Sequence, residues 1–346
     1  MKVLSTVDVR RLATECGFEL AGVCAAEPVP DFAIYADWVA RGHAGKMRYL
    51  TDRRGGMRSD PRVLLPSARS MICVGKLYNG PEPYSTTLDL SERGWISRYA
   101  WGEDYHFILE DGLNKFVQKL KAIVGDFAWR ICIDTAPLLE RSYARRAGLG
   151  WIGKNTCLIN QPLGSWFFLG EVLLSIGLEA DAPPPDRCGS CTRCIDACPT
   201  SAIVPEGSRF TIDSRLCIAY HTIEVRGAIA EDRRAGLGSH LFGCDICQDV
   251  CPWNRRAPVA EDGPFRPKAD LPPLDRLATI SEDEFRTMFR STPVSRARYS
   301  GFLRNVAIAM GNSGSGRFRE PLEALAGSRD PVVADAAVWA LARVAG

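Results

Sequence analysis

Two kinds of hydrophobic pattern alternate along the first half of the chain. Apolar residues recur at helical spacing around residues 9–16 and 109–123, which predicts amphipathic helices there. Four short runs rich in β-branched and aromatic residues predict strands instead. These runs span residues 18–24, 71–77, 129–133 and 166–176. The pattern indicates a mixed α/β domain over residues 1–180.

The second half of the chain changes character at a stiff, proline-rich stretch, residues 181–186, which no helix can cross. We expect a cysteine-rich module over residues 181–256 and a helical segment over 257–346. A weak repeat relates residues 305–311 to 336–342. We interpret these two copies as paired-helix, HEAT-like repeats that bury their apolar faces by stacking. The fold class expected for the whole chain is α+β.

Seven cysteines form two runs with the spacing of bacterial ferredoxins, and Cys217 lies upstream of the second run. In such runs three closely spaced thiolates hold one [4Fe–4S] cube and a fourth, before a proline, holds the other. We therefore assign one cluster to four of them, Cys188, Cys191, Cys194 and Cys251. The second cluster takes Cys198, Cys217, Cys244 and Cys247. Structural zinc is the alternative, but zinc explains neither the third close cysteine nor the proline after each run. The runs predict a bacterial-ferredoxin-like module that transfers electrons.

The second run lacks its first cysteine, because Cys217 lies far upstream of Cys244. Residues 218–243 are then an insertion within the module, and insertions of this length usually have a function. We expect this insertion to face the group that the clusters reduce.

Composition restricts the setting of this chemistry. The chain has 346 residues, 46% hydrophobic and 24% charged, with a net charge of +2. Those values are ordinary for a globular protein. Neither a signal peptide nor a membrane-spanning run is evident, so we expect a cytoplasmic protein that does not bind membranes. Thirteen cysteines without a secretion signal indicate a reducing compartment. Nothing demands more than a monomer.

Five further cysteines are expected to be buried packing residues. They are Cys16, Cys24, Cys73, Cys132 and Cys157.

Seven arginines and no acidic residue lie between Arg286 and Arg319. Such a stripe is typical of a surface that contacts nucleic-acid phosphates. A solvated helix face balanced by acids elsewhere explains it equally well, and the sequence alone leaves both interpretations open.

Three further features are ambiguous. Residues 148–154 approach both the dinucleotide fingerprint and the P-loop, but no strand precedes them, so we disfavour nucleotide binding and expect these glycines to end a helix. Asp134 follows a predicted strand and is either a helix N-cap or a proton donor with a raised pKa. His106 lies among aromatic residues that form either a pocket wall or plain core.

Residues 98–106, 134–141 and 147–155, the paired cluster runs and the terminal repeat occur in an order that resembles the epoxyqueuosine reductases, which act in queuosine biosynthesis on bacterial tRNA and are related to reductive dehalogenases. The resemblance covers nearly the whole chain. It implies a base-off cobalamin without a histidine ligand to cobalt, held between the first domain and the cluster module. By the same resemblance Arg58, Ser97 and Asp134 surround the corrin, and some relatives carry cysteine at the position of Ser97.

The resemblance also implies a mechanism. A ferredoxin- or flavodoxin-like donor would pass electrons through the clusters to cobalamin, the epoxide of epoxyqueuosine would be reduced, and Asp134 would protonate the departing oxygen. The arginine stripe would bind the anticodon stem, with Arg296, Arg298 and Arg304 as expected phosphate contacts. Two other functions are kept as alternatives: a corrinoid reductase of a small molecule, and a ferredoxin-type electron carrier without catalysis.

Overall fold

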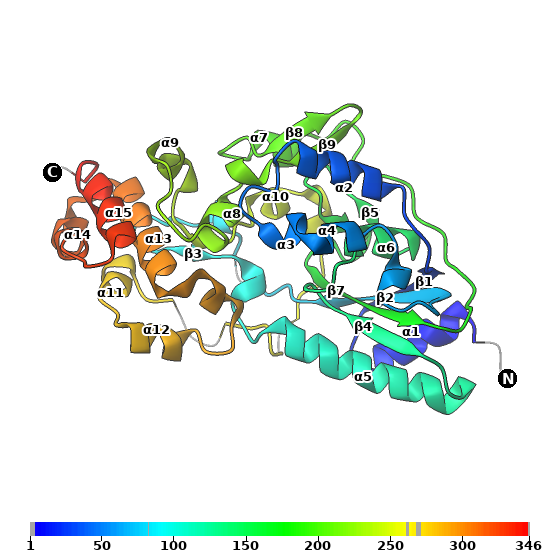
Figure 1. Ribbon diagram of the computed structural model, residues 1–346. Coiled ribbons are helices and arrows are strands. Elements are labelled where there is room, and N and C mark those ends of the chain that lie inside the picture. The colour runs from blue at the N-terminus through cyan, green and yellow to red at the C-terminus, as the bar shows by residue number, and fades with distance from the viewer. Residues whose placement is uncertain (1–3, 82, 261–262, 268–270, 345–346) are drawn as a thin grey trace. The chain divides into compact units, whose positions relative to one another are not determined.

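The computed structural model describes residues 4–81, 83–260, 263–267 and 271–344 (Figure 1). It divides into two compact units, each assembled from several chain segments. Unit 1 comprises Met1–Asn79, Tyr105–Thr192 and Pro252–Ala260. Unit 2 comprises Gly80–Asp104, Arg193–Cys251 and Glu261–Gly346. The domains expected from the sequence are contiguous segments, whereas these units are not, and the division at residues 180 and 256 stays a prediction.

Unit 1 is built on a four-stranded antiparallel sheet with strand order β1-β2-β7-β4. Its strands are β1 (Leu20–Ala25), β2 (Ser70–Leu77), β7 (Phe167–Leu174) and β4 (Trp129–Cys132). All four predicted strands are confirmed. The two central strands are buried on both faces, which explains why their sequences are continuously apolar rather than alternating.

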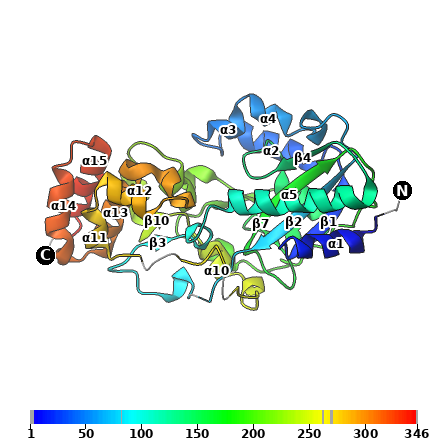
Figure 2. The same ribbon diagram turned by 90° about the horizontal axis from the view of Figure 1, so that it is seen from below.

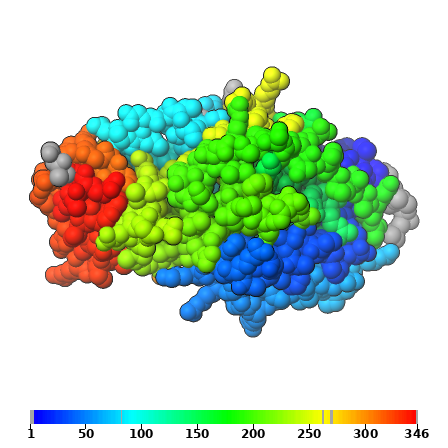
Figure 3. Space-filling view, turned by 90° about the horizontal axis from the view of Figure 1, so that it is seen from above, coloured from blue at the N-terminus to red at the C-terminus, as the bar shows by residue number. Residues whose placement is uncertain are grey.

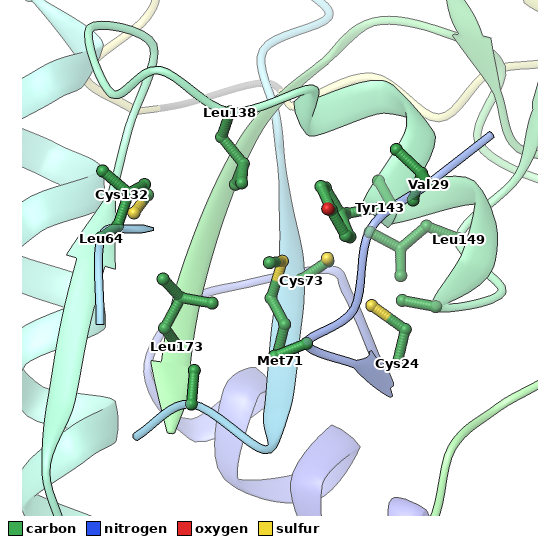
Figure 4. Close-up of a cluster of buried hydrophobic side chains, with 14 of the residues drawn as sticks. Cys24, Val29, Leu64, Met71, Cys73, Cys132, Leu138, Tyr143, Leu149 and Leu173 are labelled. Atoms are coloured by element: carbon green, nitrogen blue, oxygen red, sulfur yellow. The ribbon is translucent and has the colours of Figure 1, made fainter. Parts of the chain in front are cut away.

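Helices cover both faces of this sheet. The predicted helices are confirmed as α1 (Thr6–Glu15) and α5 (Tyr105–Val124). Figure 2 shows α5 lying across the sheet, and Leu113 approaches within 3.0 Å of where a Cβ would stand on Gly170 of β7. The opposite face carries α6 (Glu140–Arg146). There Tyr143 and Leu138 pack over Cys73 and Cys132 of the sheet (Figure 4).

The remaining α-helices and strands of unit 1 are short and lie outside the sheet. They are α2 (Asp31–Ala40), α3 (Arg48–Thr51), α4 (Arg53–Met57) and a hairpin of β5 (Trp151–Ile152) with β6 (Leu158–Ile159).

Gly22 on β1 allows α6 to pack closely on the sheet. A Cβ at Gly22 would stand 1.9 Å from the carbonyl oxygen of Ala147, a backbone atom that cannot rotate away. We therefore expect Gly22→Ala to lower the free energy of unfolding by about 1–3 kcal/mol or more through overpacking. Urea denaturation monitored by circular dichroism would measure it.

Gly56→Ala is the matched control for this prediction. Gly56 lies in α4 and has no atom within 4 Å of its Cβ position, so alanine there should be neutral or stabilising by about 0.4–1 kcal/mol. Equal stabilities of the two variants would contradict the close approach of α6 to β1.

Unit 2 combines two small sheets with many short helices. β3 (Trp95–Ile96) pairs in parallel with β10 (His240–Phe242), and β8 (Ile203–Glu206) forms a hairpin with β9 (Arg209–Ile212). Its helices are α7 (Arg193–Asp196), α8 (Ile218–Ile223), α9 (Glu231–Arg234), α10 (Ile246–Asp249), α11 (Leu274–Ala278), α12 (Glu282–Met288), α13 (Arg298–Ser313), α14 (Arg319–Ala326) and α15 (Pro331–Leu341).

The two copies of the sequence repeat lie on α13 and α15, which pack against each other. A Cβ at Gly311 would stand 2.8 Å from Ala340, so only a residue without a side chain fits at this crossing. Asp330 caps α15 by accepting a hydrogen bond from the Val332 backbone N–H at 2.9 Å.

The insertion at residues 218–243 packs against α13 through polar contacts. Arg304 donates hydrogen bonds to the backbone carbonyls of His221, Val225 and Gly227 at 2.7–2.9 Å. Asn305 donates to the carbonyls of residues 222 and 241 at 3.0 and 2.8 Å. In Figure 3 the yellow-green insertion lies beside the orange and red C-terminal helices. These bonds tie the segment between Cys217 and Cys244, two predicted cluster ligands, to the C-terminal helices.

None of the helices in the described ranges is long and apolar enough to cross a membrane.

Candidate active site and cluster-binding residues

Asp134 lies two residues beyond β4, in a turn rather than at a helix end. Helix α6 begins at Glu140 with Leu139 at its N-cap, so the N-cap interpretation of Asp134 is wrong. The backbone of Asp134 has φ 41°, a left-handed conformation that is unfavourable for a residue with a side chain. Strain of this kind is concentrated at functional sites, and the Asp134 side chain remains 40% exposed.

His106 is a basic neighbour of Asp134. Its Nε2 lies 3.3 Å from Oδ2 of Asp134, and its side chain is 34% exposed. The imidazole stacks on Tyr105, which stacks in turn on Phe168 of β7, with ring centroids 4.3 Å apart in both pairs. His106 is therefore positioned by an aromatic stack and not enclosed in the core. A histidine beside a carboxyl can hold or exchange a proton with it near neutral pH.

The sequence analysis missed two glutamates on the inner side of the Asp134 turn, Glu140 and Glu171. Glu140 accepts a hydrogen bond from the Asp134 backbone N–H, while burial and the Asp134 charge raise the pKa of its carboxyl to about 7. Glu171, on β7, is fully buried, and burial together with the Glu140 charge raises its pKa well above the usual value. The available signal was a lone glutamate inside the apolar run at residues 166–176.

Arg58 lies close enough to this group of acids for its charge to oppose the raised pKa of Glu140. The residue is only 6% exposed, and its guanidinium donates to the carbonyls of Arg54 and Tyr49 at 3.0 and 3.4 Å. It also lies over the ring of Tyr35. Arg58 therefore stands within reach of the predicted site in unit 1, and its contact with a cofactor stays a prediction.

Ser97 belongs to a buried polar network in unit 2. It is 2% exposed, and its hydroxyl donates to Asp245, which also accepts from Trp95 Nε1 at 3.0 Å and from the Arg98 backbone N–H at 2.7 Å. Asp245 directly follows Cys244, so the network fixes the start of a cluster-binding run. Contact of Ser97 with a corrin stays a prediction.

The four cysteines predicted for the second cluster all lie in unit 2. Burial raises the pKa of the Cys244 thiol well above its usual value, and the neighbouring Cys217 and Cys198 thiols add to the shift. Cys198 Sγ accepts a hydrogen bond from the Ala202 backbone N–H at 3.3 Å. Mutually repelling thiolates with N–H donors suit a cluster, whose positive irons stabilise the charges and whose potential depends on such hydrogen bonds.

The predicted ligands of the first cluster are divided between the units. Cys188 and Cys191 belong to unit 1, and Cys194 and Cys251 to unit 2. The loop that carries the first two is held by Lys154, whose Nζ donates to the carbonyls of Gly189 and Cys191 at 2.8 and 2.9 Å.

The thirteen cysteines differ in how deeply they are buried. None of the thirteen cysteines forms a disulfide. Of the five cysteines expected to be buried, Cys24, Cys73 and Cys132 are, whereas that prediction is wrong for the half-buried Cys16 and Cys157.

Residues 148–154 end helix α6, allow β5 and β6 to approach, and hold the loop at residues 189–191. Gly148 follows the end of α6 with φ 80°, which confirms that it ends a helix. A Cβ at Gly150 would stand 2.2 Å from the Ile159 carbonyl oxygen, so a side chain would separate β5 from β6. Lys154 is occupied by the carbonyls described above and is not directed at a phosphate.

The arginine stripe separates into exposed and internal members. Arg304 is 1% exposed and its donors are taken by backbone carbonyls and Asn305, which corrects the prediction that it contacts tRNA. Arg296 is exposed and pairs with Glu224 at 2.7 Å. Arg290 and Arg298 are exposed and have no ion-pair partner among the described residues. They line a hollow of about 300 Å³ with Tyr299 and Phe289.

Family models, curated relatives and solved structures all match this chain to the same family. Residues 58–135 match the family model "Epoxyqueuosine reductase QueG, DUF1730", and residues 187–254 match "4Fe-4S double cluster binding domain". The chain is 41% identical over 340 residues to the epoxyqueuosine reductase of Xanthomonas campestris pv. campestris, covering 97% of this chain and 95% of that one. The match to a 4Fe-4S double cluster binding domain supports iron–sulfur clusters over zinc.

Two solved structures are similar over 98% of this chain and 90% of theirs, both at 28% identity. One is an epoxyqueuosine reductase with an epoxyqueuosine-modified tRNA-Tyr stem loop, at a TM-score of 0.87. The other, at 0.85, is the Bacillus subtilis epoxyqueuosine reductase with its catalytic aspartate loop swung out of the active site.

Proposed function

The chain belongs to the epoxyqueuosine reductase family, and from that premise we infer that it is an oxidoreductase that reduces epoxyqueuosine to queuosine at the wobble position of tRNA anticodon loops. The observation that carries this proposal is Asp134, strained at φ 41° and partly exposed, with His106 3.3 Å away. A carboxyl placed in this way can give a proton to an oxygen that leaves the substrate. The arrangement gives no support to the electron-carrier alternative, since a carrier needs no acid.

The reaction sets what the chain must supply. Both C–O bonds of the epoxide break, a C=C bond forms, and the oxygen leaves as water, so each turnover consumes two electrons and two protons. Two [4Fe–4S] clusters bring the electrons. Asp134 is the proposed donor of the proton that reaches the departing oxygen, and His106 holds the Asp134 carboxyl in place. The turn at Asp134 is the part of unit 1 that positions this acid.

We propose cobalamin as the second cofactor, beside the two clusters. When bound, it supplies a strongly reducing, nucleophilic cobalt centre for epoxide reduction. In unit 1 the residues proposed to hold it are Arg58 and Asp134. The fit rests on the Asp134 carboxyl, which is 40% exposed and so accessible to a bound group. Arg58 is 6% exposed, so most of its guanidinium is covered by the protein.

The partners and the C-terminal helices complete the proposal. A ferredoxin- or flavodoxin-like protein is the proposed electron donor, and the enzyme is proposed to act as a monomer. The packed repeat copies on α13 and α15 are proposed to be HEAT-like and to support tRNA binding. The packing of Gly311 on Ala340 supports a stacked repeat.

The direct test is conversion of substrate. The protein would be reconstituted under anaerobic conditions with iron, sulfide and cobalamin, reduced, and incubated with tRNA that carries epoxyqueuosine. Nucleoside analysis should then show queuosine. Bound clusters and cobalamin without any conversion would contradict the proposed substrate.

Replacement of two exposed arginines should weaken tRNA binding. In an Arg296→Gln, Arg298→Gln double variant, loss of two phosphate contacts should reduce the slope of log K against log salt by about 0.7–0.9 for each contact. Fluorescence anisotropy with a labelled anticodon stem loop over a salt series would measure this.

Arg319→Gln is the control for that series. Arg319 is an exposed member of the same stripe and pairs with Glu323 at 3.5 Å, outside the proposed contact. A double variant with the same salt slope as wild type would contradict phosphate contacts at residues 296 and 298.

A further inference from the structure

A row of acidic side chains leads from the surface of unit 1 into its core. Asp134 is partly exposed, Glu140 follows at the start of α6, and Glu171 lies at the centre of β7. The first member is the proposed proton donor. The inner two have no part in the mechanism above, although Glu171 is fully buried and Glu140 is half-buried with its Oε1 enclosed. Carboxyls in such positions are rare unless they serve a purpose.

The sheet register fixes where Glu171 points. Its partners across the sheet are Cys73 on β2 and Cys132 on β4, and paired positions place their side chains on the same face. That face is covered by Tyr143 and Leu138 of the α6 region (Figure 4). Glu171 therefore lies under the helix that begins with Glu140.

These carboxyls are not held as ordinary ion pairs. Neither oxygen of Glu171 has a hydrogen-bond partner in the described structure, and the same is true of buried Oε1 of Glu140. A buried carboxylate without a partner is strongly unfavourable, so the neutral, protonated acid is the stable form of Glu171. The core of unit 1 therefore holds a protonated carboxyl, that of Glu171, near the Asp134 turn.

Glu140 is the member placed to pass its proton on. It accepts a hydrogen bond from the Asp134 backbone N–H, so its carboxyl lies beside the main chain of the donor. The charged groups that act on it are Asp134, Arg58 and Arg141. The Glu140 charge in turn raises the pKa of three buried groups of the core, Glu171, Cys73 and Cys132. Burial and, after it, the Asp134 charge raise the pKa of Glu140 to about 7, while the two arginines oppose the rise. The carboxyl is therefore poised to titrate near neutrality.

We propose that Glu140 is the second proton source of the reaction. After Asp134 has given its proton to the departing oxygen, the O–H bond of the Glu140 carboxyl breaks and a new one forms on the Asp134 carboxylate. Glu140 is left as a carboxylate and regains its proton from water between turnovers. Rotation of the Asp134 side chain or one bridging water completes the path. No electron moves in this step, and the inference rests on the proposed function.

His106 is the rival source, because its Nε2 already lies 3.3 Å from Asp134. The two are distinguishable by substitution. Glu140→Gln keeps an oxygen that accepts the Asp134 N–H but carries no transferable acid proton. His106→Gln removes the imidazole and leaves Glu140 intact.

The test combines a rate profile with a spectroscopic measurement on the reconstituted enzyme. At about pH 6 the rate of queuosine formation in Glu140→Gln should be at least about tenfold below wild type. At about pH 8.5, where wild-type Glu140 has lost its proton, the two rates should converge. In infrared spectra, a protonated-carboxyl band that disappears through about pH 7 in wild type should be absent from Glu140→Gln. Glu110→Gln, an exposed change on α5, is the control.

Three results would contradict Glu140 as the second proton source. Equal rates of queuosine formation in wild type and Glu140→Gln at pH 6 would overturn the proposal. The same holds if only His106→Gln, and not Glu140→Gln, lowers the rate at pH 6. Absence of the titrating band from wild type would overturn it without any variant, even if Glu140→Gln failed to fold. If wild type forms no queuosine at any pH, the proposed function itself fails, and the inference with it.

Discussion

Asp134→Asn should abolish queuosine formation while leaving the clusters in place. The amide occupies the same volume and keeps the turn, but it cannot donate an acid proton, and loss of a general acid typically lowers a rate by about 10²–10⁴-fold. Asn also tolerates the left-handed backbone that residue 134 adopts, so the strain at φ 41° is not increased. The measurement is queuosine formed per enzyme, alongside iron content and cluster absorbance.

A matched change elsewhere on unit 1 separates chemistry from stability. Asp111→Asn removes an exposed aspartate of α5 that pairs with Lys115 at 2.6 Å, a surface contact worth little. It should retain full activity. An active Asp134→Asn variant with intact clusters would show that the proton reaches the departing oxygen by another route.

Cys247→Ser should lose one of the two clusters and all turnover. Cys247 is one of the four predicted ligands of the second cluster, and serine offers iron a harder oxygen in place of a thiolate. We expect about half of the wild-type iron and sulfide after reconstitution, and no queuosine, because electrons would lack one stage of their path. Iron analysis and electron paramagnetic resonance of the reduced protein would measure the loss.

Cys16→Ser provides the comparison. Cys16 is half-buried and lies outside both predicted cluster runs, so its change should leave iron and activity at wild-type levels. A Cys247→Ser variant with full iron content would contradict the assignment of Cys247 as a ligand.

The sheet of unit 1 was predictable because its signals are local. Each strand is a short apolar run, and a run of that kind is recognisable without knowing its partners. The division into units was not predictable in this way. Residues 80–104 belong to unit 2 although residues on both sides of them belong to unit 1, and only long-range contacts decide that.

The site shows the same limit. Asp134 stood out because it follows a strand and lies in a recognisable motif, but its neighbour His106 comes from a different element, and no spacing rule joins the two. Glu171 was hidden inside a run that correctly predicted a strand. Arg304 was misjudged because a cluster of arginines in sequence says nothing about which side chains point inward.

The bonds between α13 and the insertion have a consequence for the order in which the protein matures. Cys217 and Cys244 leave the ribosome before Arg304 and Asn305, yet several backbone carbonyls between these two cysteines are paired by those later residues. We therefore expect the second ligand set to reach its final geometry only after synthesis of α13. Iron and sulfide would then be inserted into a finished polypeptide, and a chain truncated before α13 would be a poor recipient for the cluster.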